Sequence, residues 1–347
     1  MSTVVGVDIG STSLRAVEVE GATKARPTVV RFAEVALSDG AANSGEVVET
    51  HTVAAALKQL WSAGGFKSKR VILGMGNQRV IARDFSLPKM SRLQIQESLP
   101  FQVQDMLPMP VADALLGFYP VSEGVGDNGP VLNGLLVAAV KSAVLANVNT
   151  LQVAGLTPVE VDLIPFALTR VQTQGLTTRG TVAVVDVGAS TTNVVIVVNG
   201  VPQFVRIIPS GGDDVTKALV MRSELAESVA DQAKRALGLA TGQPKPEHRA
   251  VLEVIHEVTF ELLNSVRNTL SYFDNTHDIS NVELIILSGG GAKLPGFVNA
   301  LSELTRVQVV VKDPFSGVAL SKTASKSAGT TSGSMTVALG LALGSAA

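Results

Sequence analysis

The chain lacks cysteine altogether, and its 347 residues include only four histidines. Without cysteine there is no disulfide framework, no thiolate metal site and no thiol nucleophile. The histidines offer no second ligand at metal spacing, because His256-Glu257 is not followed by the second histidine of a zinc-protease motif. We therefore expect all four histidines to be structural or solvent-exposed.

Long apolar runs and a strong charge of one sign are missing as well. No apolar stretch approaches the ~18 residues of a membrane span, and the N-terminus has no basic segment typical of a signal peptide. The net charge is −2 and the isoelectric point is about 6.1, so no electrostatic footprint for nucleic acid is visible. Hydrophobic residues make up 46% of the chain, enough for the roughly two domains that its length favours. These features predict a soluble protein.

The most informative stretch runs from Thr181 to Asn193. A valine-rich run ends at Asp186 and continues into a turn of small residues that includes Gly188. This pattern predicts a buried strand that brings a carboxylate, several hydroxyls and backbone N–H groups to one point. Glycine lets the backbone approach a ligand closely, and the amides of such a turn can point at phosphate oxygens. We interpret this turn as a phosphate-binding turn.

A second copy of the same pattern lies at the N-terminus, between Val5 and Ser13. Its aspartate, Asp8, precedes Asp186 by 186 − 8 = 178 residues, about half the chain. Either copy alone fits an ordinary hairpin turn. Together they indicate a duplicated domain with a nucleotide between the halves, each half contributing one phosphate turn and one aspartate near Mg²⁺.

A third turn follows another buried-strand run, Val282 to Leu287. Three consecutive glycines, Gly289 to Gly291, suit a turn whose backbone lies against a flat ring or a sugar. Gly211-Gly212 precedes a helix whose amides can face a further ligand group. Two cations, Arg15 and Lys234, lie where they can neutralise phosphate, although a solvated charge explains each of them equally well.

The remaining segments alternate strands and helices. Pro88 marks a change from strands to helix and loop, and we place a subdomain boundary there. Ser91 and Gln94 form a capping-box pattern at the start of a helix, in which Pro100 predicts a kink or a break. The Gly-rich segment Ser122 to Pro130 is expected to be a loop.

Three further expectations concern local structure. Asn199-Gly200 predicts a two-residue hairpin between two strands. The Ser-, Thr- and Gly-rich segment Ser321 to Ser334 is expected to be irregular and mobile, followed by a last helix in which Gly340 permits close packing. Glu34, within an N-terminal strand, is expected on the exposed side.

These motifs together resemble the nucleotide-binding signature of the superfamily of actin, sugar kinases and heat-shock chaperones. More narrowly, the chain resembles the PilM family of actin-like type IV pilus assembly proteins and is similar to the cell-division protein FtsA. The narrower resemblance extends nearly end to end and rests on five segments: Val7 to Ser13, Leu87 to Met90, Val137 to Lys141, Ala154 to Val159, and Phe166 to Leu168.

The resemblance implies a duplicated, actin-like (ribonuclease H-like) α/β fold, with two lobes around a nucleotide cleft and an FtsA-type inserted subdomain 1C. Subdomain 1A would comprise residues 1–85, 162–180 and 321–347, and subdomain 1C residues 86–161. Subdomain 2A would comprise residues 181–210 and 281–320, and subdomain 2B residues 211–280.

ATP with Mg²⁺ would lie between the lobes, with Asp8 and Asp186 as the catalytic carboxylates that hold the metal through water. The other nucleotide contacts would come from the turns and the two cations: Gly10, Ser11, Thr12, Ser13, Arg15, Gly188, Ala189, Ser190, Thr191, Gly211, Gly212, Lys234, Gly289, Gly290 and Gly291.

The resemblance also implies a partner, the N-terminal cytoplasmic peptide of a PilN-like inner-membrane protein, bound in a groove lined by subdomains 1A and 1C. This contact would place the chain in the cytoplasm, at the inner face of the membrane. Self-association is a further contact that the superfamily allows.

One position departs from the superfamily pattern. A glutamine or glutamate usually positions the attacking water, and Ile164 occupies the matching position here. Because isoleucine can neither orient a water nor accept its proton, we expect slow hydrolysis at best. Nucleotide would then act chiefly as a structural ligand that fixes the angle between the lobes. Asp162 lies close by in the sequence and is an alternative for the missing group.

Two other functions stay open at this point. An FtsA-like membrane tether and filament former would carry a C-terminal amphipathic helix with basic residues, but no lysine or arginine follows Lys326, which argues against tethering by this tail. A small-molecule kinase of the sugar or acetate type would need a base for the substrate hydroxyl, and the sequence singles out none.

Overall fold

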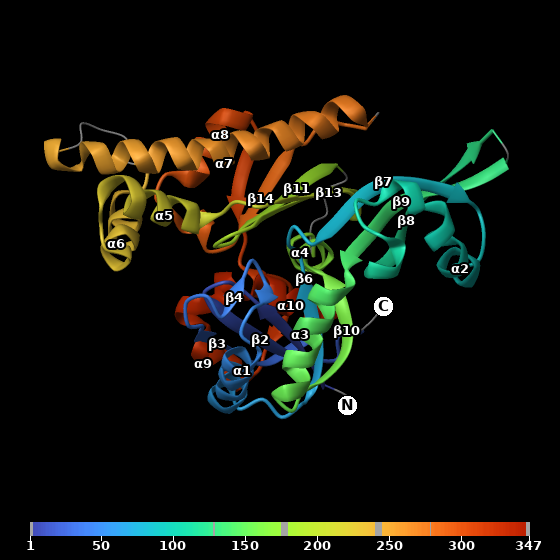
Figure 1. Cartoon of the computed structure of the whole chain (residues 1–347), viewed down its shortest axis with the longest axis horizontal. Coiled ribbons are helices and arrows are strands. Elements are labelled where there is room, and N and C mark those ends of the chain that lie inside the picture. Colours follow the sequence, from blue (N-terminus) through green and yellow to red (C-terminus); the bar gives the residue numbers. More distant parts are fainter. Residues whose placement is uncertain (1–2, 128, 175–179, 240–244, 278, 345–347) are drawn as a thin grey trace.

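The computed structural model describes residues 3–127, 129–174, 180–239, 245–277 and 279–344. Figure 1 shows two lobes, one above the other, and each lobe is built on its own β-sheet. A third, smaller sheet projects from the side. No helix within these ranges has both the length and the apolar character that a membrane crossing would require.

The lower lobe in Figure 1 contains a six-stranded sheet. Its strands, in spatial order, are β10 (Thr157–Leu163), β6 (Arg70–Met75), β1 (Thr3–Ile9), β2 (Ser13–Glu20), β3 (Thr28–Ala36) and β16 (Ala319–Leu320). One face packs against α1 (Thr50–Gly64) and α3 (Lys141–Val153), and the other against α4 (Ile164–Gln172), α9 (Lys322–Thr331) and α10 (Thr336–Gly344). A short hairpin, β4 (Ala42–Asn43) and β5 (Glu46–Val47), lies beside this sheet.

The upper lobe contains a five-stranded sheet. Its strands, in spatial order, are β13 (Val201–Ile208), β12 (Thr192–Val198), β11 (Thr181–Val187), β14 (Leu284–Ser288) and β15 (Gln308–Val311). The helices of this lobe are α5 (Gly212–Ser223), α6 (Glu227–Leu237), α7 (Arg249–Thr276) and α8 (Phe297–Thr305), and they share one core with the sheet. Short 3₁₀ turns span Gln104–Met106, Val111–Asp113, Pro246–His248, Gly291–Lys293, Pro314–Gly317 and Ser332–Met335.

The two lobes repeat one strand pattern. In the lower lobe β1 pairs antiparallel with β2 and parallel with β6, and in the upper lobe β11 pairs antiparallel with β12 and parallel with β14. The internal duplication predicted from the two aspartate turns is therefore present in the topology, and the expected two-lobe α/β architecture is confirmed.

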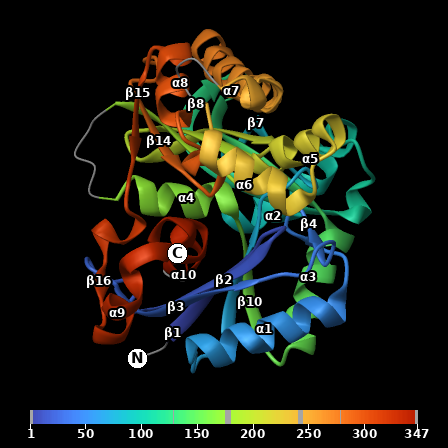
Figure 2. The ribbon, with the colours of Figure 1, turned by 90° about the vertical axis from the view of Figure 1, so that its left-hand side faces the viewer.

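Helix α4 lies between the two sheets, as Figure 2 shows. One apolar cluster joins Leu168 of this helix to Ile72 of the lower sheet and to Val184 and Val195 of the upper sheet. All four side chains are fully buried. The lobes thus share a core beneath the cleft.

The third sheet consists of β7 (Val80–Pro88), β9 (Gly129–Val140) and β8 (Ala114–Gly126), in that order, and carries α2 (Arg92–Gln102). The loop expected from Ser122 to Pro130 is wrong, because the ladder between β8 and β9 continues to the Gly126–Gly129 pair. The expected insertion boundaries, 86–161, also differ from this sheet. Helix α3 and strand β10 pack into the lower lobe, so the inserted sheet begins at Val80 and ends at Val140.

Two predictions about α2 have different outcomes. The capping box is confirmed, because the Ser91 hydroxyl accepts a hydrogen bond from the Gln94 backbone N–H while the Gln94 side chain accepts one from Ser91 N–H. Pro100 does not split the helix. It lies two residues before the end at Gln102, so the helix continues past it only briefly.

The Asn199-Gly200 hairpin is confirmed, with φ values of 51° and 85° at the two turn residues. The irregular segment expected from Ser321 to Ser334 is wrong, because it forms α9 and a 3₁₀ turn. The Ser321 hydroxyl accepts a hydrogen bond from Ala324 N–H at 3.1 Å, and Ala324 is buried in the lower core. Ser321 thus caps the start of α9, and the buried Ala324 attaches this helix of polar composition to the core.

Helix α10 packs unusually close to its neighbours. A Cβ at Gly340 would clash with the backbone carbonyl of Ala167 in α4, and a Cβ at Gly6 in β1 would clash with the carbonyl of Ala338. Glycine is therefore required where α10 meets α4 and where it meets β1, which confirms the packing role expected for Gly340. The contact fixes the inner end of β1, from which the first aspartate turn extends.

Candidate functional site

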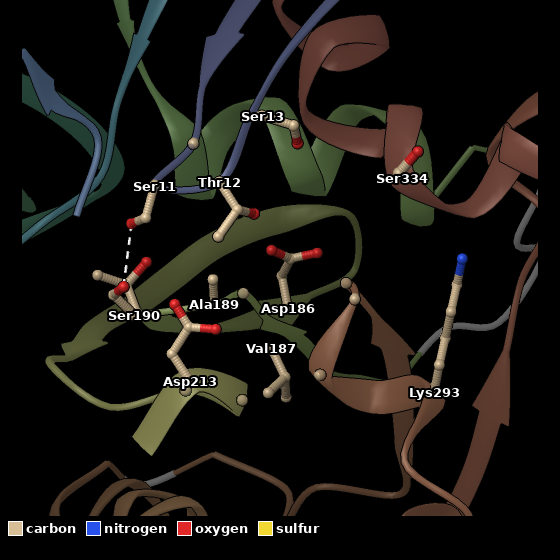
Figure 3. A pocket seen from close by; sticks show the side chains of 18 of the residues that line it. Ser11, Thr12, Ser13, Asp186, Val187, Ala189, Ser190, Asp213, Lys293 and Ser334 are labelled. Atoms are coloured by element: carbon tan, nitrogen blue, oxygen red, sulfur yellow. Dashed lines mark hydrogen bonds between the residues drawn. The ribbon is translucent and has the colours of Figure 1, made fainter. Parts of the chain in front are cut away.

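A cavity of about 930 Å³ lies between the lobes. Every residue predicted for the nucleotide site lines it, from both aspartate turns, the triple-glycine turn and the start of α5. Figure 3 shows these turns approaching one another from the two sheets. The structure thus brings the predicted residues together, while their individual roles stay predictions.

The two aspartate turns have the same construction. Gly10 N–H donates to the carbonyl of Ser13 at 3.0 Å, and Gly188 N–H donates to the carbonyl of Thr191 at 2.8 Å. In both turns a Cβ on the glycine would lie 2.9 Å from that same carbonyl oxygen. Glycine is needed because the turn folds tightly onto itself, and the repeated hydrogen bond is the local signature of the duplication.

The two turns meet across the cleft. The hydroxyl oxygens of Ser11 and Ser190 lie 3.0 Å apart, the contact drawn in Figure 3. Ser44 N–H also donates to the Ser11 hydroxyl at 3.0 Å. A hydroxyl from each lobe and one amide of the lower lobe therefore meet at one point, an arrangement that suits a phosphate chain lying between the lobes.

Asp8 and Asp186 are the buried carboxylates of this cleft. Burial raises the pKa of Asp8, opposed by the charge and the hydrogen bond of Arg15, whose Nη1 lies 3.2 Å from Oδ2. Burial likewise raises the pKa of Asp186 to about 6, although the Ser288 hydroxyl donates to its Oδ1 at 2.7 Å. The charge of Asp8 adds to the raised pKa of Asp186, and the charge of Glu34 adds to the raised pKa of Asp8, so this region favours an added cation.

The two carboxylates suit Mg²⁺ better than a metal ion that is held by protein side chains alone. Within the described ranges, no group of three or more His, Cys, Asp or Glu side chains could hold an ion. Two carboxylates that face a phosphate-sized space are the typical protein contribution to a magnesium ion that keeps its waters and binds phosphate. Asp8 and Asp186 are therefore the residues that would hold Mg²⁺.

The triple-glycine turn leaves open space beside its backbone, which suits a flat group. Gly289 has φ = 92°, which glycine alone adopts without strain, and a Cβ at Gly290 would meet no atom within 4 Å. The backbone there is open to the cavity. Apolar side chains also line the cavity: Val215, Val258, Leu262, Leu294 and Phe297.

The alternative interpretation of Lys234 and Arg15 as solvated charges is wrong. Lys234 is only 9% exposed, and its ammonium donates to the Thr216 hydroxyl at 2.7 Å and pairs with Asp231 at 2.8 Å. Arg15 pairs with Asp8 and, at 2.9 Å, with Glu34. Both cations line the cavity, and each is held by these ion pairs and hydrogen bonds.

Glu34 is a site residue that the sequence did not reveal. It was expected on the exposed side of β3, but it lines the cavity and accepts hydrogen bonds from Ser13, Arg15 and Ser334. Burial acts to raise its pKa, yet the charge of Arg15 and these hydrogen bonds outweigh it and lower the pKa. Only the register of β2 against β3, which pairs Arg15 with Glu34, identifies this position.

Asp213 and Lys293 also line the cavity without having been predicted, and Figure 3 shows them on the upper lobe. Asp213 follows Gly212 in the first turn of α5, and Lys293 closes the short turn after the glycines.

Ile164 lines the cavity at the start of α4, packed against Gly74 and Gly76. Asp162 does not line the cavity. Its carboxylate pairs with Arg170 at 2.6 Å and accepts from Leu163 N–H at 2.7 Å. The expectation that Asp162 can replace the missing water-positioning group is therefore not supported by its position.

Replacing Asp186 with asparagine should stabilise the chain at neutral pH. The pKa of Asp186 is higher in the folded chain than in the unfolded chain. The contribution of this carboxyl to stability is therefore complete below about pH 4 and is lost as the pH rises through about 6. Asparagine remains neutral and still accepts from Ser288. We expect the free energy of unfolding to rise by on the order of 2 kcal/mol at pH 7.5, and by little near pH 4. Urea unfolding across this range, with exposed Asp113→Asn as control, measures it; a pH-independent difference would contradict the assignment.

Comparison with known proteins agrees with the cleft architecture. A family model described as type IV pilus assembly protein PilM matches residues 6–346. The chain is similar to the PilM chain solved in a PilM–PilN type IV pilus biogenesis complex, with 26% identity, a TM-score of 0.84, and coverage of 99% of this chain and 98% of that one.

Two more distant similarities concern one curated protein and one solved structure, and the structure agrees with the expected actin-like fold class. The chain is 25% identical to the cell division protein FtsA of Enterococcus hirae over 89% of this chain and 78% of FtsA. A structure of MreB 5 of Spiroplasma citri bound to AMPPNP superposes with a TM-score of 0.54 at 11% identity, covering 98% of this chain and 95% of that one. With a two-lobe fold, duplicated turns and a family model that spans nearly every residue, this chain belongs to the type IV pilus assembly protein PilM family.

Proposed function

We propose that the chain is a nucleotide-binding assembly scaffold of the type IV pilus machinery. In this proposal it binds ATP with Mg²⁺ between its lobes and the N-terminal cytoplasmic peptide of a PilN-like inner-membrane protein on its surface. The observation that carries the proposal is the convergence of all three predicted turns on one interlobe cavity in a chain of the PilM family. Its place would be the cytoplasm, at the inner face of the membrane, held there by the partner.

The cavity supports the nucleotide part of the proposal. The convergent donors of the Ser11 and Ser190 turns would bind phosphate, and Asp8 and Asp186 would hold Mg²⁺, which neutralises the phosphate charge when bound. The open backbone at Gly290 and the apolar side chains that line the cavity would take the adenosine. The distantly similar MreB 5 structure contains AMPPNP, an ATP analogue, which is consistent with this use of the fold.

Gly290→Val should abolish tight nucleotide binding without harming the fold. A side chain at this position meets no protein atom within 4 Å, so it would fill ligand space rather than clash with the chain. We expect the affinity for Mg-ATP to fall at least about tenfold by isothermal titration, because the base would lose its place against the backbone. Gly117→Val, at another position with no atom within 4 Å, is the matched control. Unchanged affinity in Gly290→Val would refute this placement of the adenosine.

Ile164 supports a structural rather than a catalytic use of ATP. It occupies the cavity wall where a water-positioning amide or carboxylate would be required, and Asp162 is engaged elsewhere. ATP bound between lobes that touch through Ser11 and Ser190 would instead stabilise one lobe angle.

Hydrolysis by the wild-type chain should be slow, on the order of 10⁻³ per second, the scale of a nucleotidase that lacks its activating group. Ile164→Gln would restore a group able to orient water and should raise this rate, whereas Ile164→Leu should not. Single-turnover measurements with radiolabelled ATP test both variants. Turnover near 1 per second in the wild-type chain would show that another residue supplies the missing function.

The peptide part of the proposal concerns the junction between the lower lobe and the third sheet. We infer that the third sheet with α2 is subdomain 1C. Strand β10 is an edge strand of the lower sheet, runs below the third sheet in Figure 1, and exposes Val159 and Val161. Across the junction Tyr119 of β8 packs against Phe166 of α4, with ring centroids 4.7 Å apart. An extended peptide can pair with such an edge and bury its apolar side chains.

Val161→Asp should weaken binding of the PilN-like N-terminal peptide at least about tenfold, because a carboxylate would be desolvated at the peptide contact. Val125→Asp, at a residue 90% exposed near the tip of β8, is the matched control and should bind normally. Titration of a fluorescent peptide measures both. Loss of binding in the control alone would move the site from β10 to the end of the third sheet.

A further inference from the structure

Glu34 lies at the junction of three segments that border the phosphate end of the cavity. Its carboxylate accepts from the Ser13 hydroxyl at 2.8 Å, from Arg15 Nε at 2.9 Å and from the Ser334 hydroxyl at 3.0 Å. Ser13 and Arg15 follow the first aspartate turn, and Ser334 lies in the 3₁₀ turn before α10. A surface carboxylate would not be expected to hold so many fixed partners.

Arg15 lies between two carboxylates. Its Nε donates to Glu34, and its Nη1 donates to Asp8 at 3.2 Å. The same Nη1 is 3.3 Å from the position that a Cβ on Gly10 would occupy, so the guanidinium lies directly against the phosphate turn. In the parts of the chain that the structure describes, Nη2 has no hydrogen-bond partner.

These contacts divide the guanidinium into two ends. The Nε end is held by a carboxylate outside the aspartate pair, and the Nη end faces the aspartate and the turn. An arginine has five donors in a rigid fork, so one end can stay fixed while the other exchanges its acceptor.

We propose that Glu34 is a positioning residue for Arg15: it holds Nε, so that the terminal nitrogens can transfer from Asp8 to a phosphate oxygen of the bound nucleotide. This inference rests on the proposed function, since it requires nucleotide in the cleft. Transfer of Arg15 to phosphate would release an oxygen of Asp8 at the same moment, leaving that carboxylate free for the hydrated cation.

A different role for Glu34 would have the opposite sign. A carboxylate that acts only through its charge repels phosphate, and its neutralisation would then strengthen ATP binding. A positioning carboxylate must instead be long enough to bring an acceptor oxygen to Arg15 Nε, and this length matters more than the charge. Two substitutions separate these properties. Glu34→Gln keeps the length and an acceptor oxygen but loses the charge, and Glu34→Asp keeps the charge but is one methylene too short.

The experiment is isothermal titration of the full chain with Mg-ATP, with adenosine measured by competition. We expect Glu34→Asp to lower the affinity for ATP about tenfold and to leave that for adenosine within about twofold, because only the phosphate end loses a charged hydrogen bond. We expect Glu34→Gln to bind ATP within about threefold of wild type. Thermal unfolding of each variant shows whether it is folded.

A double-mutant cycle with Arg15→Ala completes the test. If Glu34 acts through Arg15, Glu34→Asp will have no further effect on ATP affinity in the Arg15→Ala chain. Equal losses in both backgrounds, tighter ATP binding by Glu34→Gln, or a parallel loss of adenosine affinity would overturn the inference and leave the proposed function intact. A wild-type chain that binds no ATP would overturn the proposed function and this inference with it.

Discussion

The structure depends on one electrostatic constraint, the burial of two carboxylates that face the same cavity from different sheets. Burial raises the pKa of both Asp8 and Asp186, because the ionised carboxylate is disfavoured there unless a positive charge or a hydrogen-bond donor stabilises it. The chain supplies only partial compensation, through Arg15 for Asp8 and the Ser288 hydroxyl for Asp186. The cleft therefore has a deficit of positive charge beside its two aspartates. The amides, hydroxyls and glycines of the turns surround this region.

Much of the fold and of the cleft lining was accessible from the sequence. The aspartate turns and the triple-glycine turn are local patterns, in which one glycine is required by a close backbone approach, and their repetition at half the chain length reveals the duplication. Asn199-Gly200 and the Ser91 capping box are likewise set by residues within four positions of one another.

What the sequence did not reveal depends on contacts between distant segments. Glu34 belongs to the site only because β3 pairs with β2 in a register that places it opposite Arg15. Helix α9 was hidden by its polar composition, since Ala324 is its buried anchor and alanine gives little pattern. The inserted sheet ends at Val140, before α3 and β10, and these two elements pack into the lower lobe through contacts that no local motif indicates.

The position of α4 has a consequence for motion. This helix contributes Leu168 to a core that includes Val184 of one sheet and Ile72 of the other. Separating the two lobes at this point would therefore expose buried aliphatic surface to water. A small sliding movement of each sheet against α4 would keep these apolar contacts buried. Because the third sheet projects from the side of the molecule (Figure 1), even a slight rotation about α4 would displace its outer tip farther than the residues beside the helix.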